Sequence, residues 1–272
     1  MRTQALATES DGPTIGTLVD WPNGERLGIW RAIAPLGCGG TAEVWQVVAP
    51  DGREAALKFP KREWRGHAAV NALLRREHDV LCTVASPHIV ASYELTELDG
   101  AAALVLEYLP HGDLVPLLGA PPRQWLPAFR AVVAALVDLE RHGFAHGDVK
   151  PRNVLFAADG SARLIDLTSA RPLDAPASMT TAAYGLPART PARSRDADCF
   201  ALAVLLFELL TARLPYGPSG ASDPAAELPT VLPADPVAAD LLAAATVALR
   251  AQGRVQGLSY FSDVIESVRP YG

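Results

Sequence analysis

The 272-residue chain has few cysteines, and the three present stand apart at positions 38, 82 and 199. Their number and spacing exclude a disulfide framework and a zinc site, so an intracellular, cytoplasmic setting is expected, with Cys82 and Cys199 as small core residues. The N-terminus lacks the basic and then apolar pattern of a secretion signal. The longest apolar run, residues 199–210, contains Glu208 and is shorter than the roughly 20 residues of a membrane span. We therefore expect a buried helix there, and no membrane partner.

Positive charge is also scarce, because 24 Lys and Arg stand against 30 Asp and Glu and give a net charge of −6. Nucleic-acid-binding proteins usually carry a basic surface, so no nucleic-acid partner is expected. Hydrophobic residues make up 49% of the chain and charged residues 20%, a composition that argues against disorder. A chain of this length and composition can form one domain or two tightly joined lobes.

The first part of the chain alternates short apolar segments with turns, which predicts an antiparallel sheet carrying one helix. Residues 14–21 and 25–29 flank Asn23-Gly24, a favourable hairpin turn, so residues 1–26 could form an extra strand pair or a loose arm. The strands are expected at residues 28–36, 43–48, 54–59, 89–95 and 102–108, and the helix at 67–84.

After Gly112 the pattern becomes mostly helical. An amphipathic helix that includes Trp125 and Leu139 is expected to end near His142 and Gly143. Two short strands at residues 154–156 and 163–165, a buried helix at 196–212, a long Pro- and Gly-rich loop at 214–236, and two helices at 236–252 and 257–268 complete the expected order. The fold class predicted from these elements is α+β.

Two features of the first part suit phosphate binding. Residues 36–44 place glycines between two strands, where backbone N–H groups can approach phosphate oxygens closely. Because a strand follows and not a helix, this is not a dinucleotide-binding turn. Lys58 closes an apolar strand, and burying its ammonium requires a partner, for which Glu77 on the next helix is suited.

Two features of the second part suit phosphoryl transfer. Residues 146–155, His-Gly-Asp-Val-Lys-Pro-Arg-Asn-Val-Leu, put a base (Asp148), a cation (Lys150) and a metal ligand (Asn153) on one loop. Asp166 ends a short apolar strand. Each feature alone is an ordinary turn or strand end, but their order along the chain is specific.

In this order the glycine loop, strand lysine, helix glutamate, catalytic loop and metal aspartate resemble the eukaryotic-type protein kinase family, and its bacterial Ser/Thr members in particular. The resemblance covers residues 27–268. It implies a bilobal fold, with an N-lobe at 27–109 formed by a sheet and one helix and a mainly helical C-lobe at 110–268. It also implies ATP and Mg²⁺ or Mn²⁺ as cofactors and a protein as the substrate.

The resemblance assigns roles to individual residues. Lys58, paired with Glu77, would hold the α- and β-phosphates, Asp148 would accept the proton of the substrate hydroxyl, and Lys150 would steady the transferred group. Asn153 and Asp166 would bind the metal, Asp198 would anchor the catalytic loop, and Thr181 would bond to Asp148 and Lys150. The residues expected to contact the nucleotide are Leu36, Gly37, Gly39, Gly40, Val44, Ala56, Lys58, Leu106, Glu107, Leu109 and Leu155.

The sequence departs from the family pattern at several positions. Gly147 replaces the arginine that reads a phosphate on the activation segment, so control by that route is not expected. Thr168 replaces a glycine, and its stiffness is expected to restrict reorientation of Asp166. Ala188 replaces a glutamate, which removes an ion pair with Arg254, and residues 214–236 do not predict the usual docking helix. Ser169, Ser178, Thr180 and Thr181 remain open to modification.

Two alternatives stay open beside a Ser/Thr protein kinase. His-Gly-Asp followed by Asn also occurs in small-molecule kinases of the aminoglycoside and choline type, although Lys150-Pro151 and residues 181–187 favour a protein substrate. Thr168, Ala188 and Gly147 are compatible with a pseudokinase that binds ATP without turnover. The sequence does not indicate an oligomeric state.

Overall fold

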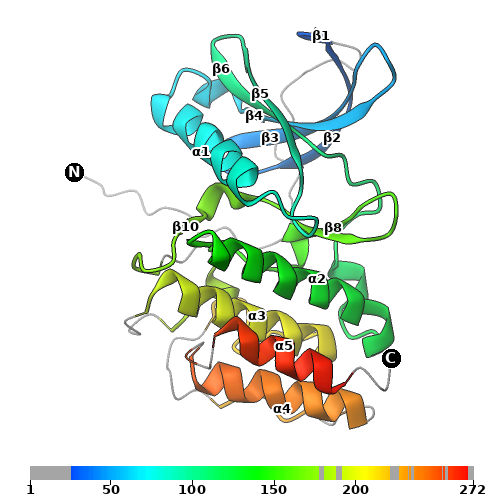
Figure 1. Cartoon of the computed structure of the whole chain (residues 1–272), viewed down its shortest axis with the longest axis vertical. Coiled ribbons are helices and arrows are strands. Elements are labelled where there is room, and N and C mark those ends of the chain that lie inside the picture. The colour runs from blue at the N-terminus through cyan, green and yellow to red at the C-terminus, as the bar shows by residue number, and fades with distance from the viewer. Residues whose placement is uncertain are drawn as a thin grey trace, which may run out of the picture.

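The computed structural model describes residues 26–177, 181–187, 192–220, 227–231, 233, 236–252, 254 and 257–268. It has two parts, a sheet with one helix above and a group of helices below (Figure 1). This is the α+β fold predicted from the sequence. The predicted extension lies outside the described residues except for Arg26, and the lobe boundary after residue 109 remains a prediction.

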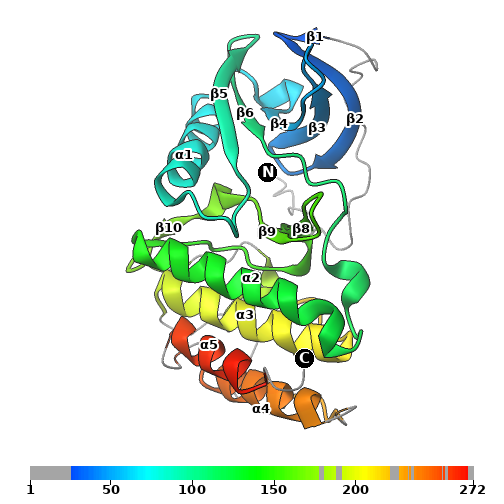
Figure 2. The same cartoon turned by 45° about the vertical axis from the view of Figure 1, so that its right-hand side comes forward.

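The upper part is a six-stranded antiparallel sheet of order β1-β2-β3-β4-β6-β5, and Figure 2 labels all of its strands. Alternate residues of a strand point to opposite faces, and residues of both faces are buried in the central strands of this sheet. Ala56 belongs to the main core, whereas Leu57 and Phe59 belong to a second apolar cluster on the other face. Lys58 lies between them in sequence and shares the face of Ala56. The strands are β1 Arg26–Leu27, β2 Trp30–Cys38, β3 Ala42–Val48, β4 Glu54–Pro60, β5 Ser92–Leu98 and β6 Ala101–Leu106.

Several predicted strand boundaries are wrong: the strand predicted at 102–108 ends at Leu106, and two other strands begin later than predicted. Leu27 pairs with Trp30, so Gly28, at a φ of +60°, and Ile29 form a tight turn instead of strand. The predicted strand at residues 89–95 begins late, at Ser92, because Ile89 forms a parallel bridge with Leu164 of the lower part. Short apolar segments do not reveal from sequence which neighbour they pair with.

Helix α1 (Ala68–Val84) lies against one face of the sheet, as Figure 1 shows. Its buried residues include Val70, Leu74, Glu77 and Leu81, which recur at helical spacing. Cys82 follows this stripe and is exposed, so the expectation that it is a core residue was wrong. The helix ends at Ala85, whose left-handed conformation lets its N–H bond the carbonyl of Leu81.

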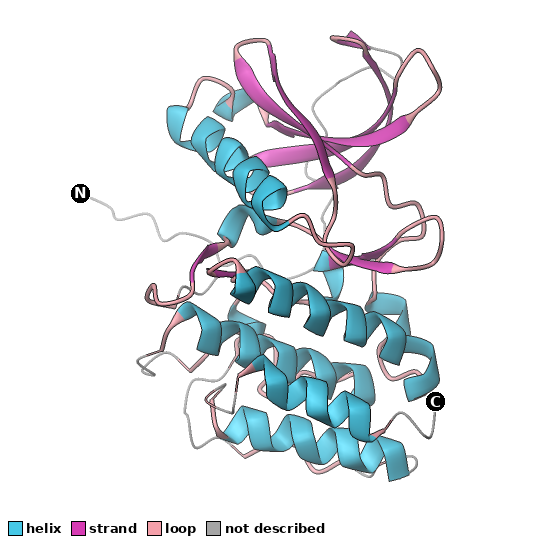
Figure 3. Cartoon of the chain, in the orientation of Figure 1, coloured by secondary structure: helices cyan, strands magenta, loops and turns pink. Residues whose placement is uncertain are grey.

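Four longer helices form the lower part (Figure 3), where α2 and α4 each contact α3 and α5. Helix α3 is buried along almost its whole length, as predicted, and Cys199 lies in its core-facing surface. Between α3 and α4 the described residues contain no helix, which agrees with the predicted loop. The helices are α2 Pro122–Arg141, α3 Ser194–Thr211, α4 Pro236–Arg250 and α5 Leu258–Ser267.

In the described residues no helix is both long and apolar enough to cross a membrane.

Short strands and turns connect the two parts and carry most of the candidate site. The strands are β7 Phe144–Ala145, β8 Val154–Phe156, β9 Ala162–Leu164 and β10 Arg171–Pro172, and the 3₁₀ turns are η1 Arg62–Trp64, η2 Val115–Leu117, η3 Pro151–Asn153, η4 Leu167–Ser169 and η5 Ala182–Tyr184.

Phe129 supports the helical core that carries the catalytic loop. It is 0% exposed and meets Trp125 and Phe261 edge-on, with ring centroids 6.3 and 6.4 Å away. We expect Phe129→Ala to lower the free energy of unfolding by about 3–5 kcal/mol, because it leaves a cavity between α2 and α5. Urea unfolding measures this, with exposed Gln124→Ala on the same helix as control. A loss below about 1 kcal/mol would contradict this description of the core.

Candidate active site

The upper and lower parts meet at the ammonium group of Lys58. Its Nζ lies 2.8 Å from Oε2 of Glu77 and 2.8 Å from Oδ1 of Asp166. The Lys58 and Glu77 side chains are 12% and 0% exposed, and that of Asp166 is 39% exposed. The pair predicted between Lys58 and Glu77 is therefore formed, and Asp166 completes it from the other part of the chain.

This arrangement keeps Lys58 and Asp166 in their charged forms. Burial alone would lower the pKa of Lys58, but the negative charges of Glu77 and Asp166 outweigh burial and raise it. Burial likewise would raise the pKa of Asp166, but the charge of Lys58 and the hydrogen bonds from Lys58 and Thr168 lower it well below its ordinary value. Removal of one partner from such a buried pair typically costs about 3–5 kcal/mol.

Thr168 adds a fourth polar group to this cluster, which the sequence did not predict. Its Oγ1 accepts a hydrogen bond from Nζ of Lys58 at 2.8 Å. The same Oγ1 lies 2.9 Å from Oε2 of Glu77 and 2.7 Å from Oδ1 of Asp166, so these two carboxylates share its single hydroxyl proton. One hydroxyl thus lies between two carboxylates that belong to different parts of the molecule.

The catalytic loop brings its base, its cation and an amide together. Lys150 Nζ donates to Oδ2 of Asp148 at 2.8 Å and to Oγ1 of Thr181 at 3.0 Å. Thr181 Oγ1 donates to Oδ1 of Asp148 at 2.7 Å, and Nδ2 of Asn153 donates to Oδ2 at 3.1 Å. The bonds predicted from Thr181 to Asp148 and Lys150 are therefore present, and Asp148 is held in a fixed orientation.

Two buried groups fix the backbone of this loop. The carboxylate of Asp198 on α3 accepts the N–H groups of His146 and Gly147 at 2.6 and 2.8 Å, as predicted. His146 is 0% exposed, and its Nδ1 accepts the N–H of Asp148 at 3.1 Å. Its Nε2 therefore carries the proton and donates to the carbonyl of Ile165 at 2.9 Å. The sequence pattern does not predict a role for His146, although this residue joins the catalytic loop to the residue before Asp166.

Gly147 is required by a close approach of the chain. It has a φ of +83°, and a Cβ at this position would lie 2.8 Å from the carbonyl oxygen of Ser169. A side chain here would separate the catalytic loop from the segment that follows Asp166. The glycine therefore has a structural reason, beyond the loss of the arginine noted from the sequence.

Five of the predicted nucleotide-contacting residues line one apolar region. Ala56, Leu106 and Leu109 belong to the main core, and the partly buried side chains of Val44 and Leu155 pack against it. Ala56 pairs directly with Leu106, and Val44 pairs with Lys58. Lys58 and the apolar region are thus adjacent on one sheet face.

The glycine loop joins β2 to β3 over this region. The N–H of Gly39 donates to the carbonyl of Ala42 at 2.8 Å and closes a tight turn. Gly37 and Gly40 have no atom within 4 Å of an added Cβ, and Leu36 is 45% exposed. The predicted loop residues therefore form an exposed and uncrowded turn between two strands.

The segment between the two parts, residues 107–109, has backbone groups that a ligand can bond. The N–H of Glu107 is bonded to the carbonyl of Ala91 at 2.9 Å, and its side chain lies 3.7 Å from Arg163. No described residue bonds the N–H of Leu109, which is next to the apolar region. The N–H of Leu109 and the carbonyl of Glu107 are two of the backbone groups in this segment that bond no described residue.

Asn153 and Asp166 fit a hard metal ion. Their backbones are close, because the N–H of Ile165 donates to the carbonyl of Asn153 at 2.9 Å. The described hydrogen bonds use Nδ2 of Asn153 and Oδ1 of Asp166, which leaves Oδ1 of Asn153 and Oδ2 of Asp166 as oxygen donors. Mg²⁺ prefers oxygen donors and takes only one or two from protein, with phosphate oxygens and water completing its shell. No group of three His, Cys, Asp or Glu suited to a metal occurs among the described residues.

The segment after Thr181 is tied to α3 by a second buried carboxylate. The hydroxyl of Tyr184 donates to Oε2 of Glu208, and burial together with the charge of Glu208 raises the pKa of this tyrosine. Ala188, where we expected a lost ion pair with Arg254, lies outside the described residues, as do Ser178 and Thr180. The bond from Tyr184 to Glu208 supplies an anchor that the sequence analysis did not identify.

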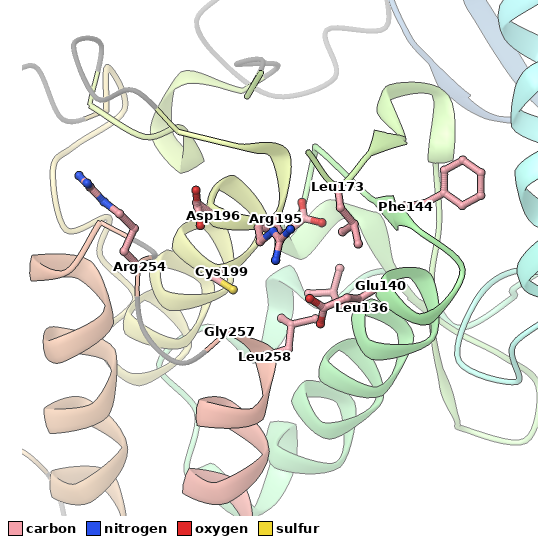
Figure 4. A pocket seen from close by; sticks show the side chains of 11 residues that line it. Leu136, Glu140, Phe144, Leu173, Arg195, Asp196, Cys199, Arg254, Gly257 and Leu258 are labelled. Atoms are coloured by element: carbon pink, nitrogen blue, oxygen red, sulfur yellow. The ribbon is translucent and has the colours of Figure 1, made fainter. Parts of the chain in front are cut away.

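A cavity lies elsewhere in the lower part, and Figure 4 shows the side chains that line it. It has a volume of about 420 Å³ and lies between α2, α3 and α5, with Glu140, Asp198, Cys199 and Leu258 in its wall. Burial raises the pKa of Cys199 to about 12, so its thiol is protonated at neutral pH. None of the residues predicted to bind nucleotide or metal lines this cavity.

Comparisons with known proteins agree with this geometry. A family model described as "Protein kinase domain" matches residues 30–231. The chain is similar to CBL-interacting protein kinase 4 of Oryza sativa subsp. japonica, with 34% identity over 215 residues, which are 72% of this chain and 47% of that protein.

Two bacterial relatives give matches of similar extent. Serine/threonine-protein kinase PknD of Mycobacterium tuberculosis is 30% identical over 208 residues, covering 71% of this chain and 31% of that protein. Serine/threonine-protein kinase PrkC of Bacillus subtilis is 28% identical over 209 residues, covering 71% and 32%. The matches therefore span less than half the length of these three relatives.

We expect Gly147→Ala to lower the free energy of unfolding by about 2 kcal/mol or more, because a Cβ is disfavoured at positive φ and would also meet the Ser169 carbonyl. Gly143→Ala is the matched control, since Gly143 has the same φ of +83° and no atom within 4 Å of an added Cβ. The free energy of unfolding of each variant is measured in urea. The difference between the two losses gives the cost of the close approach to Ser169 alone. Equal losses would show that Ser169 does not constrain the loop.

We expect Glu208→Gln to gain stability relative to the wild type as the pH rises. Burial raises the pKa of Glu208, and the Tyr184 hydrogen bond offsets this only partly. The folded protein thus binds this proton more tightly than the unfolded chain, so stability is greatest below the ordinary pKa and is lost as pH rises through the folded pKa. Glutamine keeps the acceptor without the charge.

The measurement is the free energy of unfolding of both proteins in urea between pH 4 and pH 8. Glu208→Ala serves as the control, because it leaves the Tyr184 hydroxyl without its acceptor and should cost about 1–3 kcal/mol. A wild-type stability that rises against the glutamine variant with pH would contradict the assignment.

Proposed function

The chain belongs to the protein kinase domain family, and from that premise we propose that it is an ATP-dependent kinase that phosphorylates serine or threonine hydroxyls of proteins. The observation that carries the proposal is the bonded group of Asp148, Lys150 and Thr181. It joins a base and a cation on one loop to a segment that can receive a peptide. The two bacterial relatives carry the printed name serine/threonine-protein kinase, which supports the same substrate class.

In the proposed mechanism the substrate hydroxyl binds at the Asp148 carboxylate. Asp148 would orient this oxygen toward the terminal phosphate and accept its proton as the new P–O bond forms, while the bond between the terminal phosphorus and the bridging oxygen breaks and ADP leaves. Lys150, 2.8 Å from the same carboxylate, places a positive charge where the transferred group gains negative charge. The bonds from Thr181 and Asn153 keep the base in one orientation, so that most of the acceleration comes from positioning.

The other parts of the proposed site hold the nucleotide. Lys58, fixed by Glu77, binds the α- and β-phosphates, and the glycine loop covers them with its backbone N–H groups. The residues that would hold the adenine are Val44, Ala56, Leu106 and Leu155 of the apolar region. The carbonyl of Glu107 and the N–H of Leu109 bond the edge of the base.

Mg²⁺ or Mn²⁺, held by Asn153 and Asp166, would neutralise phosphate charge. The protein substrate and a cytoplasmic location remain proposals, the latter resting on the low cysteine content. The pseudokinase and small-molecule alternatives are tested by the same experiment as the proposal.

The experiment incubates purified protein with labelled ATP and Mg²⁺ or Mn²⁺, either alone, with generic protein substrates or with a panel of small alcohols. We expect label on protein hydroxyls, and a loss of at least about 100-fold in Asp148→Asn, because that variant loses the base. ATP binding, measured by calorimetry, should persist in Asp148→Asn and weaken strongly in Lys58→Met.

Matched controls are Asp263→Asn on the exposed face of α5 and Lys61→Met beyond β4. Both should transfer phosphate at the wild-type rate. Transfer to small alcohols alone would identify a small-molecule kinase, and ATP binding without transfer to any acceptor would identify a pseudokinase; either result overturns the proposal.

A further inference from the structure

Helix α1 is joined to the segment after Asp166 by two consecutive residues. The guanidinium of Arg76 donates to the carbonyl of Ala170, and the carboxylate of Glu77 accepts from Thr168. The two contacts lie on either side of Ser169. The orientation of α1 and the path of residues 166–170 are therefore linked at two points.

Through Thr168, this link between α1 and residues 166–170 contacts Lys58 and Asp166. It lies in turn η4 (Leu167–Ser169), whose Leu167 is 1% exposed in the core, so the backbone has little freedom to move. Asp166, immediately before the turn, adopts a left-handed conformation with φ of 64° and ψ of 71°. The turn thus holds Asp166 in a backbone conformation that a non-glycine residue seldom adopts without support.

We infer that Thr168 is a positioning residue whose hydroxyl couples α1 to Asp166 and keeps Lys58, Glu77 and Asp166 assembled in one arrangement before nucleotide binds. The methyl group cannot do this, because the link consists of the bonds at 2.7–2.9 Å from Oγ1. Without the hydroxyl, the carboxylates of Glu77 and Asp166 share only the Lys58 ammonium. A single ammonium on a flexible stem fixes two separate elements less well than an ammonium and a rigid β-branched side chain together.

This role makes the assembly independent of a phosphate on the segment. The residue before the catalytic base is Gly147, which has no side chain to pair with a phosphate. The close approach of Ser169 also leaves no room for a side chain at this position. The contacts that hold residues 166–170 against α1 come instead from Thr168 and Arg76. The inference rests on the proposed function only for its effect on phosphate transfer, since the link itself is a property of the free protein.

The first test is hydrogen exchange of the nucleotide-free protein. Thr168→Val keeps the shape and removes the hydroxyl, and Thr168→Ser restores it. We expect amides of α1 and of residues 167–170 to exchange about tenfold faster in Thr168→Val, with rates in Thr168→Ser close to the wild type, because a hydrogen bond to a charged group contributes about this factor. The control is Thr83→Val, which changes an exposed threonine of α1 and should leave exchange unchanged.

Three exchange results would overturn the inference. These are unchanged exchange in Thr168→Val, faster exchange spread evenly over the whole chain, and a failure of Thr168→Ser to restore protection. The even increase would show a general loss of stability instead of a specific link. Because no phosphate transfer is measured, these results hold whether or not the chain is an active kinase.

The second test separates positioning from binding of the substrate. With phosphatase-treated protein, we expect Thr168→Val to lower kcat about tenfold and weaken ATP binding, with little change in KM for the protein substrate. Thr168→Ser should retain most of the wild-type kcat. A variant that changes only KM for the protein substrate, or a Thr168→Val protein as active as the wild type, would contradict the role of the hydroxyl.

Discussion

The position of the Lys58 ammonium is the constraint on which the site depends. A largely buried positive charge is unstable without partners, and its two carboxylates come from residues 19 and 108 positions further along the chain. The sheet, α1 and the segment after β9 therefore have to meet at one place. The same requirement orients the apolar region next to Lys58 and aligns Asp166 with the catalytic loop, which His146 joins to Ile165.

Helix α3 provides the second constraint, because it combines an apolar body with two buried carboxylates. Asp198 near its start holds the backbone of the catalytic loop, and Glu208 near its end holds Tyr184 of the segment that follows Thr181. Burial raises the pKa of both carboxyl groups, so their bonds to backbone and hydroxyl donors are needed to keep them in the core. One helix thus fixes both sides of the space in front of Asp148.

The sequence was sufficient for the elements with strong periodicity and for local motifs. Helices α1, α2 and α3 lie close to their predicted ranges, and the Lys58 to Glu77 pair was predicted because a buried ammonium needs a partner. Short segments were less predictable, since Ile89 bridges to β9 and Cys82 lies just outside the apolar stripe of α1. The Thr168 bonds could not be predicted, because their partners are 91 and 110 residues away and are set by packing of the two parts. The roles of the site residues remain predictions.

The hydrogen bonds between Asp198 and the backbone of the catalytic loop also bear on the order in which parts of the chain can be anchored during synthesis. Asp198 is 52 and 51 residues beyond the two N–H groups it accepts, so a growing chain has no anchor for residues 146 and 147 until α3 has been made. All six strands of the sheet and α1 precede that point. During synthesis, therefore, the residues of the sheet and of the Lys58 to Glu77 pair are made before the residue that anchors the catalytic loop. Asp148 and Lys150 lie on the loop whose backbone anchor is thus the last of these parts to be synthesised.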